Sequence, residues 1–198
     1  MYLFKKNTIN LIKIKINFLL ILSSLFFFTN TSANEKYVGF IDSLQGDASI
    51  IKGEETVKLN EFDQIFINDK IKTDTGSSII ISFIDNSLLT LKDKSEFSVN
   101  EFDKDSSKPL FILSITDGKF TFESGSIAKK KDGEMKIRLS GLDVKLNGTL
   151  ITGENSEGEK NVSLLEDSTG NLGTLEIGIE GSNETKIISD SASGVSLT

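Results

Sequence analysis

A run of β-branched and aromatic residues at positions 79–84 dominates the hydrophobic pattern of this chain. In an extended backbone, the odd-numbered residues of this run point to one face, and Ile80 and Ile84 point to the other. Because both faces are apolar, the pattern predicts an inner strand that has neighbours on both edges and is covered on both faces. Turn residues at 74–76 precede the run, and residues 85–86 separate it from a second apolar run, which indicates two tightly joined strands.

Short apolar runs recur about every ten residues along the rest of the chain, several of them alternating with polar residues. No segment after residue 33 keeps helical apolar spacing for longer than a turn or two. The sequence therefore predicts an all-β fold, a single compact domain of many short strands arranged as a sandwich, a rolled barrel or a β-helix-like coil. Further strands are expected at residues 37–41, 48–52, 56–59, 64–67, 96–102, 110–115, 119–122, 135–139, 142–146, 149–152, 161–165, 172–179 and 185–189.

Turn chemistry divides these strands. Asp117 and Gly118 lie between two apolar runs, and this pair predicts a β-hairpin formed by residues 110–115 and 119–122. Further turns are expected at Gly53 and Glu54, at Ser140 and Gly141, and at Asn147 and Gly148. Residues 103–109 and 124–134 are expected to be long polar loops, and residues 153–160 a flexible connection.

The first 33 residues differ from the rest. Four lysines without an acid precede an apolar run at residues 16–28, and small and polar residues follow as far as Ala33. This order predicts a secretory signal helix with cleavage after Ala33, and therefore a periplasmic or secreted protein. The apolar run is shorter than the roughly 20 residues of a membrane-spanning helix. An uncleaved anchor is the alternative, and it would be the only membrane contact.

These signals give a provisional division of the chain. We expect a signal peptide at residues 1–33 and a β domain at residues 37–152. Residues 153–189 are expected to add strands that pack on the same domain, and residues 190–198 to form a flexible tail.

Charge and residue usage exclude several functional classes. The chain has 22 basic and 29 acidic residues, and removal of the four N-terminal lysines leaves 18 basic residues and a net charge near −11. Nucleic acid is an unfavourable partner for such a protein. There is no Cys and no His, so disulfides, thiolate or histidine zinc sites, and Ser-His-Asp or Cys-His catalysis are excluded. We expect no enzyme activity, no cofactor, no metal and no small-molecule substrate.

The order of turns and strands is more specific than the fold class. A segment from Asp69 to Gly76 leads into the central strand, which ends at Asp85, Asn86 and Ser87; Gly118 and then Gly148 and Thr149 follow. This order resembles the FecR-type periplasmic domain family over roughly residues 38–151. The residues that carry the resemblance are Gly76, Asp85, Asn86, Ser87, Gly118, Gly148 and Thr149. From the residues themselves, we interpret these positions as turn and strand-end determinants rather than ligands.

Two positions depart from the family pattern. Asn86 replaces the usual Gly, and Asn tolerates a left-handed backbone. Asn147 replaces the usual Arg. Only about fifteen residues precede the apolar run, so the sigma-factor-binding role of larger family members should not be carried over. The resemblance implies an exported FecR-like module that contacts an unidentified envelope protein, in signalling or scaffolding.

Two alternatives rest on weaker signals. A carbohydrate- or polymer-binding domain usually stacks aromatic rings on sugars, yet the chain has no Trp, and Tyr37 is the only Tyr after residue 33. A calcium-dependent adhesion accessory would use residues 103–107, which lack the Gly that a calcium loop needs at its sixth position, or Glu166 and Asp167. The three lysines at 129–131 are interpreted as a solubilising loop tip.

Overall fold

The computed structural model describes residues 36–179, 184–190 and 193–197, and these form an almost purely β structure. The predicted signal segment lies outside the described residues. One 3-10 turn, η2 (Ile127–Lys129), interrupts the strands. The strands are β1 (Gly39–Gln45), β2 (Ala48–Lys52), β3 (Glu55–Lys58), β4 (Gln64–Ile65), β5 (Lys70–Thr73), β6 (Ser78–Phe83), β7 (Leu88–Leu91), β8 (Glu96–Asp103), β9 (Leu110–Glu123), β10 (Glu134–Leu139), β11 (Leu142–Asn147), β12 (Leu150–Ser156), β13 (Glu159–Leu165), β14 (Thr174–Ile179), β15 (Thr185–Ile188) and β16 (Gly194–Leu197).

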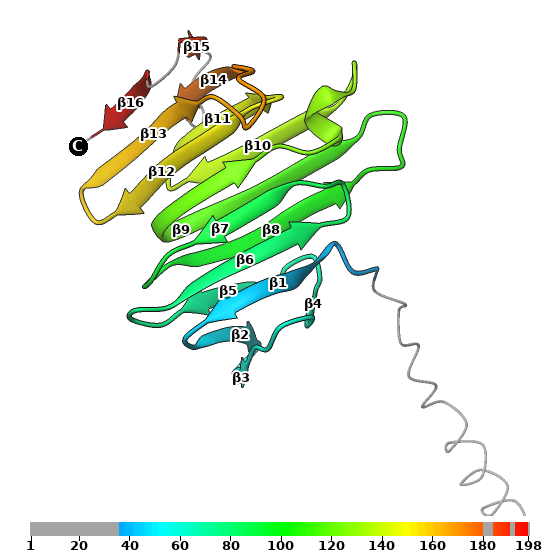
Figure 1. Cartoon of the computed structure of the whole chain (residues 1–198), viewed down its shortest axis with the longest axis vertical. Coiled ribbons are helices and arrows are strands. Elements are labelled where there is room, and N and C mark those ends of the chain that lie inside the picture. The colour runs from blue at the N-terminus through cyan, green and yellow to red at the C-terminus, as the bar shows by residue number, and fades with distance from the viewer. Residues whose placement is uncertain (1–35, 180–183, 191–192, 198) are drawn as a thin grey trace, which may run out of the picture. The chain divides into compact units, whose positions relative to one another are not determined.

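The strands form one hydrogen-bonded sheet of 16 strands that is folded into two layers (Figure 1). Layer A has the order β4-β1-β6-β7-β9-β12-β13-β16. Layer B has the order β3-β2-β5-β8-β9-β10-β11-β14-β15. All pairs are antiparallel except β9 with β10. The prediction of an all-β fold is confirmed, and the chain passes repeatedly between the two layers.

Strand β9 belongs to both layers. Its first half pairs with β8 and β10 in layer B, and its second half pairs with β7 and β12 in layer A. The predicted hairpin at Asp117 and Gly118 is therefore wrong, because the chain continues through these residues instead of turning back. Gly118 has φ 95°, and a Cβ atom there would lie 2.0 Å from Ser95 Oγ. Glycine is needed where the strand changes layers and passes close to Ser95.

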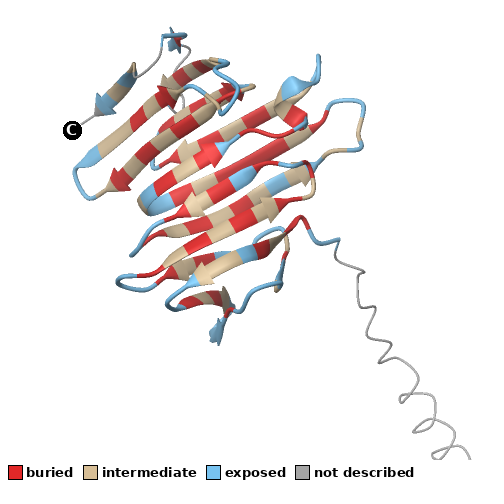
Figure 2. Cartoon of the chain, in the orientation of Figure 1, coloured by how far each residue is buried: buried red, intermediate tan, exposed pale blue. Residues whose placement is uncertain are grey.

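The core lies between the two layers, where buried and half-buried residues alternate along most strands (Figure 2). In β6, Ile79, Ile81 and Phe83 are buried, whereas Ile80 is half-buried on the outer face. The predicted inner position is confirmed, since β6 pairs with β1 and β7. The expected cover on both faces is not found, because Ile80 and Ile84 lie on the half-exposed outer side. A two-layer sheet encloses only one face of each strand.

An aromatic cluster joins the layers at the centre of the core. The ring of Phe111 in β9 lies 4.8 Å from that of Phe83 and 6.1 Å from that of Phe122, measured between centroids, and both contacts are edge-to-face. Phe102 in β8 adds a third edge-to-face contact with Phe111 at 4.9 Å. Rings in this arrangement add roughly 0.5–1.5 kcal/mol per pair beyond the burial of their area.

Other turns follow local chemistry more closely. Gly53 and Gly141 connect the hairpins β2–β3 and β10–β11, as predicted. Residues 153–160 are not a loop connection but belong to the β12–β13 hairpin, with Gly158 at φ 86°. Residues 194–197, which we expected in a weak tail, form β16 and pair with β13. Beyond β12, β13 pairs with β12 and β14 pairs with β11, and β16 and β15 then pair with β13 and β14, so these strands extend the same two layers.

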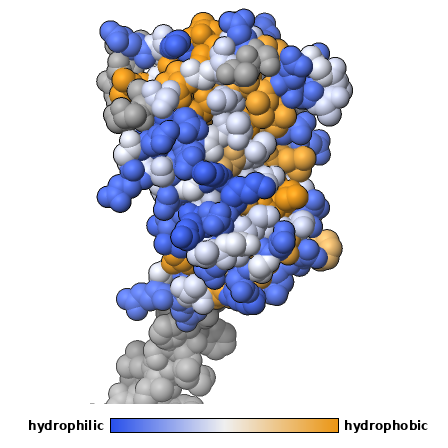
Figure 3. All heavy atoms as spheres, turned by 60° about the vertical axis from the view of Figure 1, so that its left-hand side comes forward, coloured by the Kyte–Doolittle hydropathy of each residue, from blue (hydrophilic) through white to orange (hydrophobic). Residues whose placement is uncertain are grey.

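The outer faces of the two layers differ in chemistry. Layer B carries ion pairs, among them Glu96 with two lysines of β5 and Lys136 with Glu134 and Asp143. Layer A carries a row of hydroxyl residues at matched register, formed by Thr90, Thr121, Thr152 and Ser163. Figure 3 shows hydrophilic residues over the left and centre of its view and hydrophobic residues toward the right and the top. Among the described residues, no helix is long and apolar enough to cross a membrane.

Candidate functional site

Asp85 and Ser87, two of the predicted site residues, lie at the centre of a buried hydrogen-bond network. Asp85 is 1% exposed, and its carboxylate accepts bonds from Ser87 N at 3.1 Å and from Ser87 Oγ at 3.0 Å. Ser87 Oγ accepts a bond from Gly125 N at 2.9 Å, and the Asp85 carbonyl accepts one from Ser126 N at 2.7 Å. The network fixes the β6–β7 hairpin to the chain that leaves β9. Asn86, between the two, has φ 67°, which confirms that Asn adopts the left-handed backbone there.

Gly148 and Thr149 adjoin the same chain segment. Thr149 N donates to Ser124 Oγ at 2.7 Å, and Ser124 N donates to the Thr149 carbonyl at 2.9 Å. Gly148 has φ 66° and starts the passage from β11 in layer B to β12 in layer A. A cavity of about 20 Å³ adjoins these residues, with Lys129 and Asp167 also in its wall. This volume is close to that of a single water molecule.

Gly76 and Gly118 belong to the other end of β6. There Thr73 Oγ1 donates to the Lys92 carbonyl at 2.6 Å and accepts a bond from Ser95 N at 2.9 Å. Gly118 packs against Ser95, as described above. Gly76 is exposed, with φ 74° and open space within 4 Å of the point where a Cβ atom would lie, so only its backbone conformation calls for glycine.

The predicted site residues therefore form two groups at opposite ends of β6, and the polar contacts they make are mostly to the backbone.

The two acidic loops that were candidates for calcium binding also direct their carboxylates to groups of their own loop. Asp103 Oδ1 accepts bonds from the backbone N–H of residues 105 and 106, both at 3.1 Å. The hydroxyl of Thr169 and backbone N–H groups of the same loop bind Asp167 and hold the pKa of its carboxyl below the usual value. Among the described residues, no group of three or more acidic side chains is placed to hold a metal ion.

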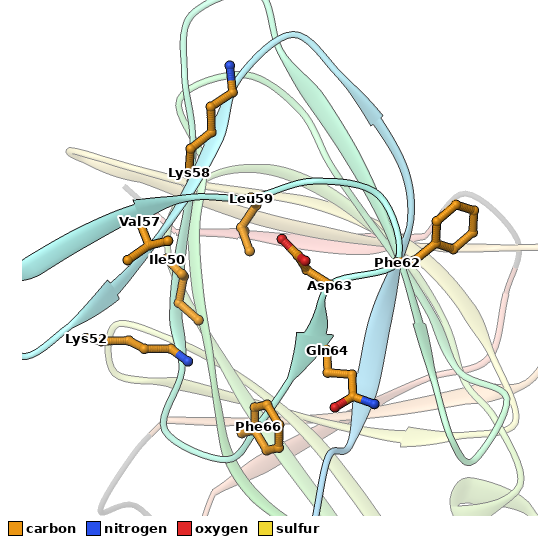
Figure 4. Close-up of a pocket in the computed structure, with 9 residues that line it drawn as sticks. All are labelled: Ile50, Lys52, Val57, Lys58, Leu59, Phe62, Asp63, Gln64 and Phe66. Carbon is orange, nitrogen blue, oxygen red and sulfur yellow. The ribbon is translucent and has the colours of Figure 1, made fainter.

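A groove of about 480 Å³ lies at the end of the sandwich where β3 closes layer B and β4 closes layer A, and we call it the end groove. In Figure 4, Ile50, Leu59 and Asp63 point toward its centre, and the Lys52 side chain reaches toward the Phe66 ring. The ammonium nitrogen of Lys52 lies 5.7 Å from the centroid of that ring. The residues that line the end groove are Ile50, Lys52, Val57, Lys58, Leu59, Phe62, Asp63, Gln64 and Phe66.

Phe62 is the most unusual residue of the end groove. It is 73% exposed, its φ is 71°, and its ring points away from the centre of the groove (Figure 4). It occupies the third position of a turn in which Asp63 N donates to the Asn60 carbonyl, a position that Gly or Asn normally takes when φ is positive. The turn is held in place because Phe62 N donates to the Ile41 carbonyl at 2.8 Å and Asn60 N to Asp63 Oδ2 at 2.8 Å.

A large apolar side chain is thus held exposed on an unfavourable backbone. Such a conformation costs roughly 1–3 kcal/mol and persists only where the surrounding structure enforces it. Sequence reasoning missed this site. The available signal was a single Phe within the polar run of residues 60–64.

The comparison with protein families decides the affiliation of the chain. The model of the family described as FecR protein matches residues 69–168, which are 100 of the 198 residues. The chain belongs to the FecR protein family. The match includes all seven of the positions that carried the resemblance in the sequence, and it begins beyond the residues that line the end groove. No curated protein matches the chain.

Two solved structures are similar to this FecR family member. Both are crystal structures of a candidate anti-sigma factor from Parabacteroides distasonis, at 1.65 and 2.50 Å resolution. Each has 13% sequence identity and a TM-score of 0.46, and the similarity covers 62% of this chain. The similarity spans 60% of the length of the anti-sigma factor chain.

Proposed function

We propose that this protein is an exported, non-enzymatic FecR-like interaction module of the bacterial cell envelope, which contacts another protein in signalling or scaffolding. Membership in the FecR family supports a regulatory role in signalling. The N-terminal basic and apolar sequence supports export to the periplasm or beyond. In this proposal the seven family-motif positions maintain the fold and do not contact the partner.

Phe62 is the observation that carries the proposal. An aromatic side chain that is 73% exposed contributes little to the stability of the isolated domain, yet its backbone is strained. Aromatic residues at protein interfaces commonly provide a large share of the binding free energy. We therefore place the contact at the end groove, with Phe62 as the residue that a partner covers.

The side-chain chemistry supports a binding role over catalysis. The chain contains neither Cys nor His. The buried Asp85 carboxylate binds Ser87 and the backbone next to it, so it does not face an open cleft. The titratable side chains in the wall of the end groove are two lysines and Asp63, and the Asp63 carboxylate accepts a backbone hydrogen bond from its own turn.

Site-specific photo-crosslinking in envelope extracts tests the proposal. A photoreactive residue is placed at position 62 of the mature protein, and the matched control carries it at Ile187, which is 70% exposed at the other end of the layers. We expect one defined protein adduct from position 62, abolished by an excess of unlabelled wild-type protein and absent from position 187. No adduct at position 62, or the same adducts from both positions, would refute the proposal.

A further inference from the structure

The outer edge of β3 is open for hydrogen bonding. Within the described part of the chain, β3 pairs only with β2, and all four of its residues are exposed. Leu59 N donates to the Ala48 carbonyl, so Leu59 and Ala48 form a hydrogen-bonded pair. Every second pair of the β2–β3 ladder counted from this one is therefore also hydrogen-bonded. In an antiparallel ladder, every second residue directs its N–H and C=O groups away from the neighbouring strand. Thr56 and Lys58 are therefore the residues whose backbone groups face outward.

The side chains of β3 alternate between the inner and the outer face of layer B. Val57 is opposite Ile50, a buried core residue, so it points into the end groove between the layers. Thr56 points to the outer face of layer B, away from the groove. A strand added beside β3 would consequently place every second side chain in the end groove, next to Val57.

The charge in the groove selects for an acidic residue. Lys58 binds Asp47 in an ion pair, whereas Lys52 makes no ion pair with any residue that the structure describes and lies over the Phe66 ring. A lysine held against an aromatic ring, with open space in front of it, can still accept a carboxylate as partner.

We propose that the partner inserts an extended segment that pairs with the free edge of β3 as an added strand, with apolar side chains toward Val57 and a carboxylate toward Lys52. This inference rests on the proposed function and specifies its binding mode. Strand addition uses backbone hydrogen bonds for affinity and alternate side-chain pockets for specificity. Glu55 lies opposite Lys52 in the β2–β3 ladder and Asp63 lines the same groove, but within the described structure neither forms an ion pair with Lys52. The carboxylate of the added strand would therefore supply the charge that complements this ammonium group.

Substitution of the outward-facing backbone donor tests the added strand directly. Thr56→Pro removes one N–H that points away from β2 and leaves the β2–β3 ladder intact, and proline is tolerated at such edge positions. Thr56→Val keeps the N–H and the β-branched shape and serves as the matched control. The probe is a fluorescent peptide that alternates threonine with valine and carries one glutamate, and a lysine counterpart replaces that glutamate. Binding is measured by fluorescence anisotropy, and the melting curve of each variant verifies that it is folded.

The expected result is that the glutamate peptide binds the wild type and Thr56→Val equally and binds Thr56→Pro about tenfold more weakly. Lys52→Glu should reverse the preference between the glutamate and lysine peptides. Absence of peptide binding to the wild type, or equal binding to folded Thr56→Pro, would overturn the inference. If position 62 forms its adduct while Thr56→Pro still captures the same protein, strand addition is refuted and the proposed function stands. If peptide binding depends on residue 56 but position 62 forms no adduct in envelope extracts, the result supports strand addition and counts against the proposed function in the envelope.

Discussion

Replacing Phe62 by alanine and by glycine tests separately how this residue affects the free energy of unfolding and whether its ring contacts the partner. About a quarter of the side chain is buried, since the residue is 73% exposed. A Phe buries roughly 150–250 Å² when enclosed, so about 50 Å² is at stake, or about 1.2 kcal/mol at 25 cal/mol per Å². Phe62→Ala should therefore lower the free energy of unfolding by about 1 kcal/mol, because it removes the ring and retains the positive φ of 71°.

Phe62→Gly removes the same ring and also relieves the backbone. The left-handed conformation costs a residue with a Cβ atom about 1–2 kcal/mol, and the extra flexibility of unfolded glycine offsets about 0.5–1 kcal/mol of that. Glycine should therefore be more stable than alanine at position 62 by about 0.5–1 kcal/mol, the reverse of their order inside a strand. When added as unlabelled competitors, both variants should fail to abolish the adduct formed from position 62, whereas the unlabelled wild type abolishes it.

Urea unfolding of residues 34–198 measures this difference. The transition midpoint should shift between the two variants without a change in slope, since the surface exposed on unfolding is nearly the same. Alanine as stable as glycine would show that the backbone at residue 62 is not strained. Full competition by both variants would show that the partner does not use the ring, whatever the stabilities.

Three further predictions concern the fold. Gly118→Ala should destabilise the domain by at least about 3 kcal/mol, because its Cβ would lie 2.0 Å from Ser95 Oγ, whereas Gly76→Ala should cost only about 1 kcal/mol; similar urea midpoints for the two would contradict this. Asp85→Asn should cost about 1.5–3 kcal/mol by weakening bonds to a buried carboxylate, and an unchanged midpoint would argue against that network. Burial alone would raise the pKa of Glu96, but hydrogen bonds from Lys70 and Lys72 outweigh it and hold this pKa below the usual value. The stability from Glu96 is thus present at neutral pH and lost as the pH falls through that lowered pKa, so Glu96→Gln should flatten the acid limb of a melting-temperature profile, and an unchanged limb would exclude this contribution.

The sequence predicted those features that depend on neighbouring residues. The tight β6–β7 connection follows from turn chemistry at Asp85 and Asn86, and the inner position of β6 follows from its apolar run. The burial of only one face of β6 does not follow from that run, because it depends on the two-layer architecture. Asp117 and Gly118 have equally strong turn chemistry, yet the chain continues through them. The reason is that each half of β9 pairs with strands distant in sequence, and this pairing outweighs the local preference.

The end groove was hidden from sequence reasoning for a related reason. Its residues come from β2, β3, β4 and the connections around β4, and none of these segments marks a site alone. Phe62 carried the only local signal, as an apolar residue where a turn calls for Gly or Asn. Six of the seven motif residues lie at turns or strand ends, and Gly118 lies inside β9 where the strand changes layers. Because these residues shape the backbone locally, they are poor indicators of where a partner binds.

The position of the end groove follows from how the two layers are closed. At the centre, β9 gives both layers a common strand, and hydrogen-bond networks lock both ends of β6. At the β3 and β4 end, no strand of the described chain joins the layers, so two sheet edges and the apolar space between them stay open. Free edges invite unwanted pairing, and natural proteins usually protect them. Here the protection is partial, with Lys58 drawn to Asp47 while Phe62 is held outward by its bond to β1. Under the proposed function, the partner supplies the missing protection, since an added strand would cover the open edge of β3 and the same partner would cover the exposed ring of Phe62.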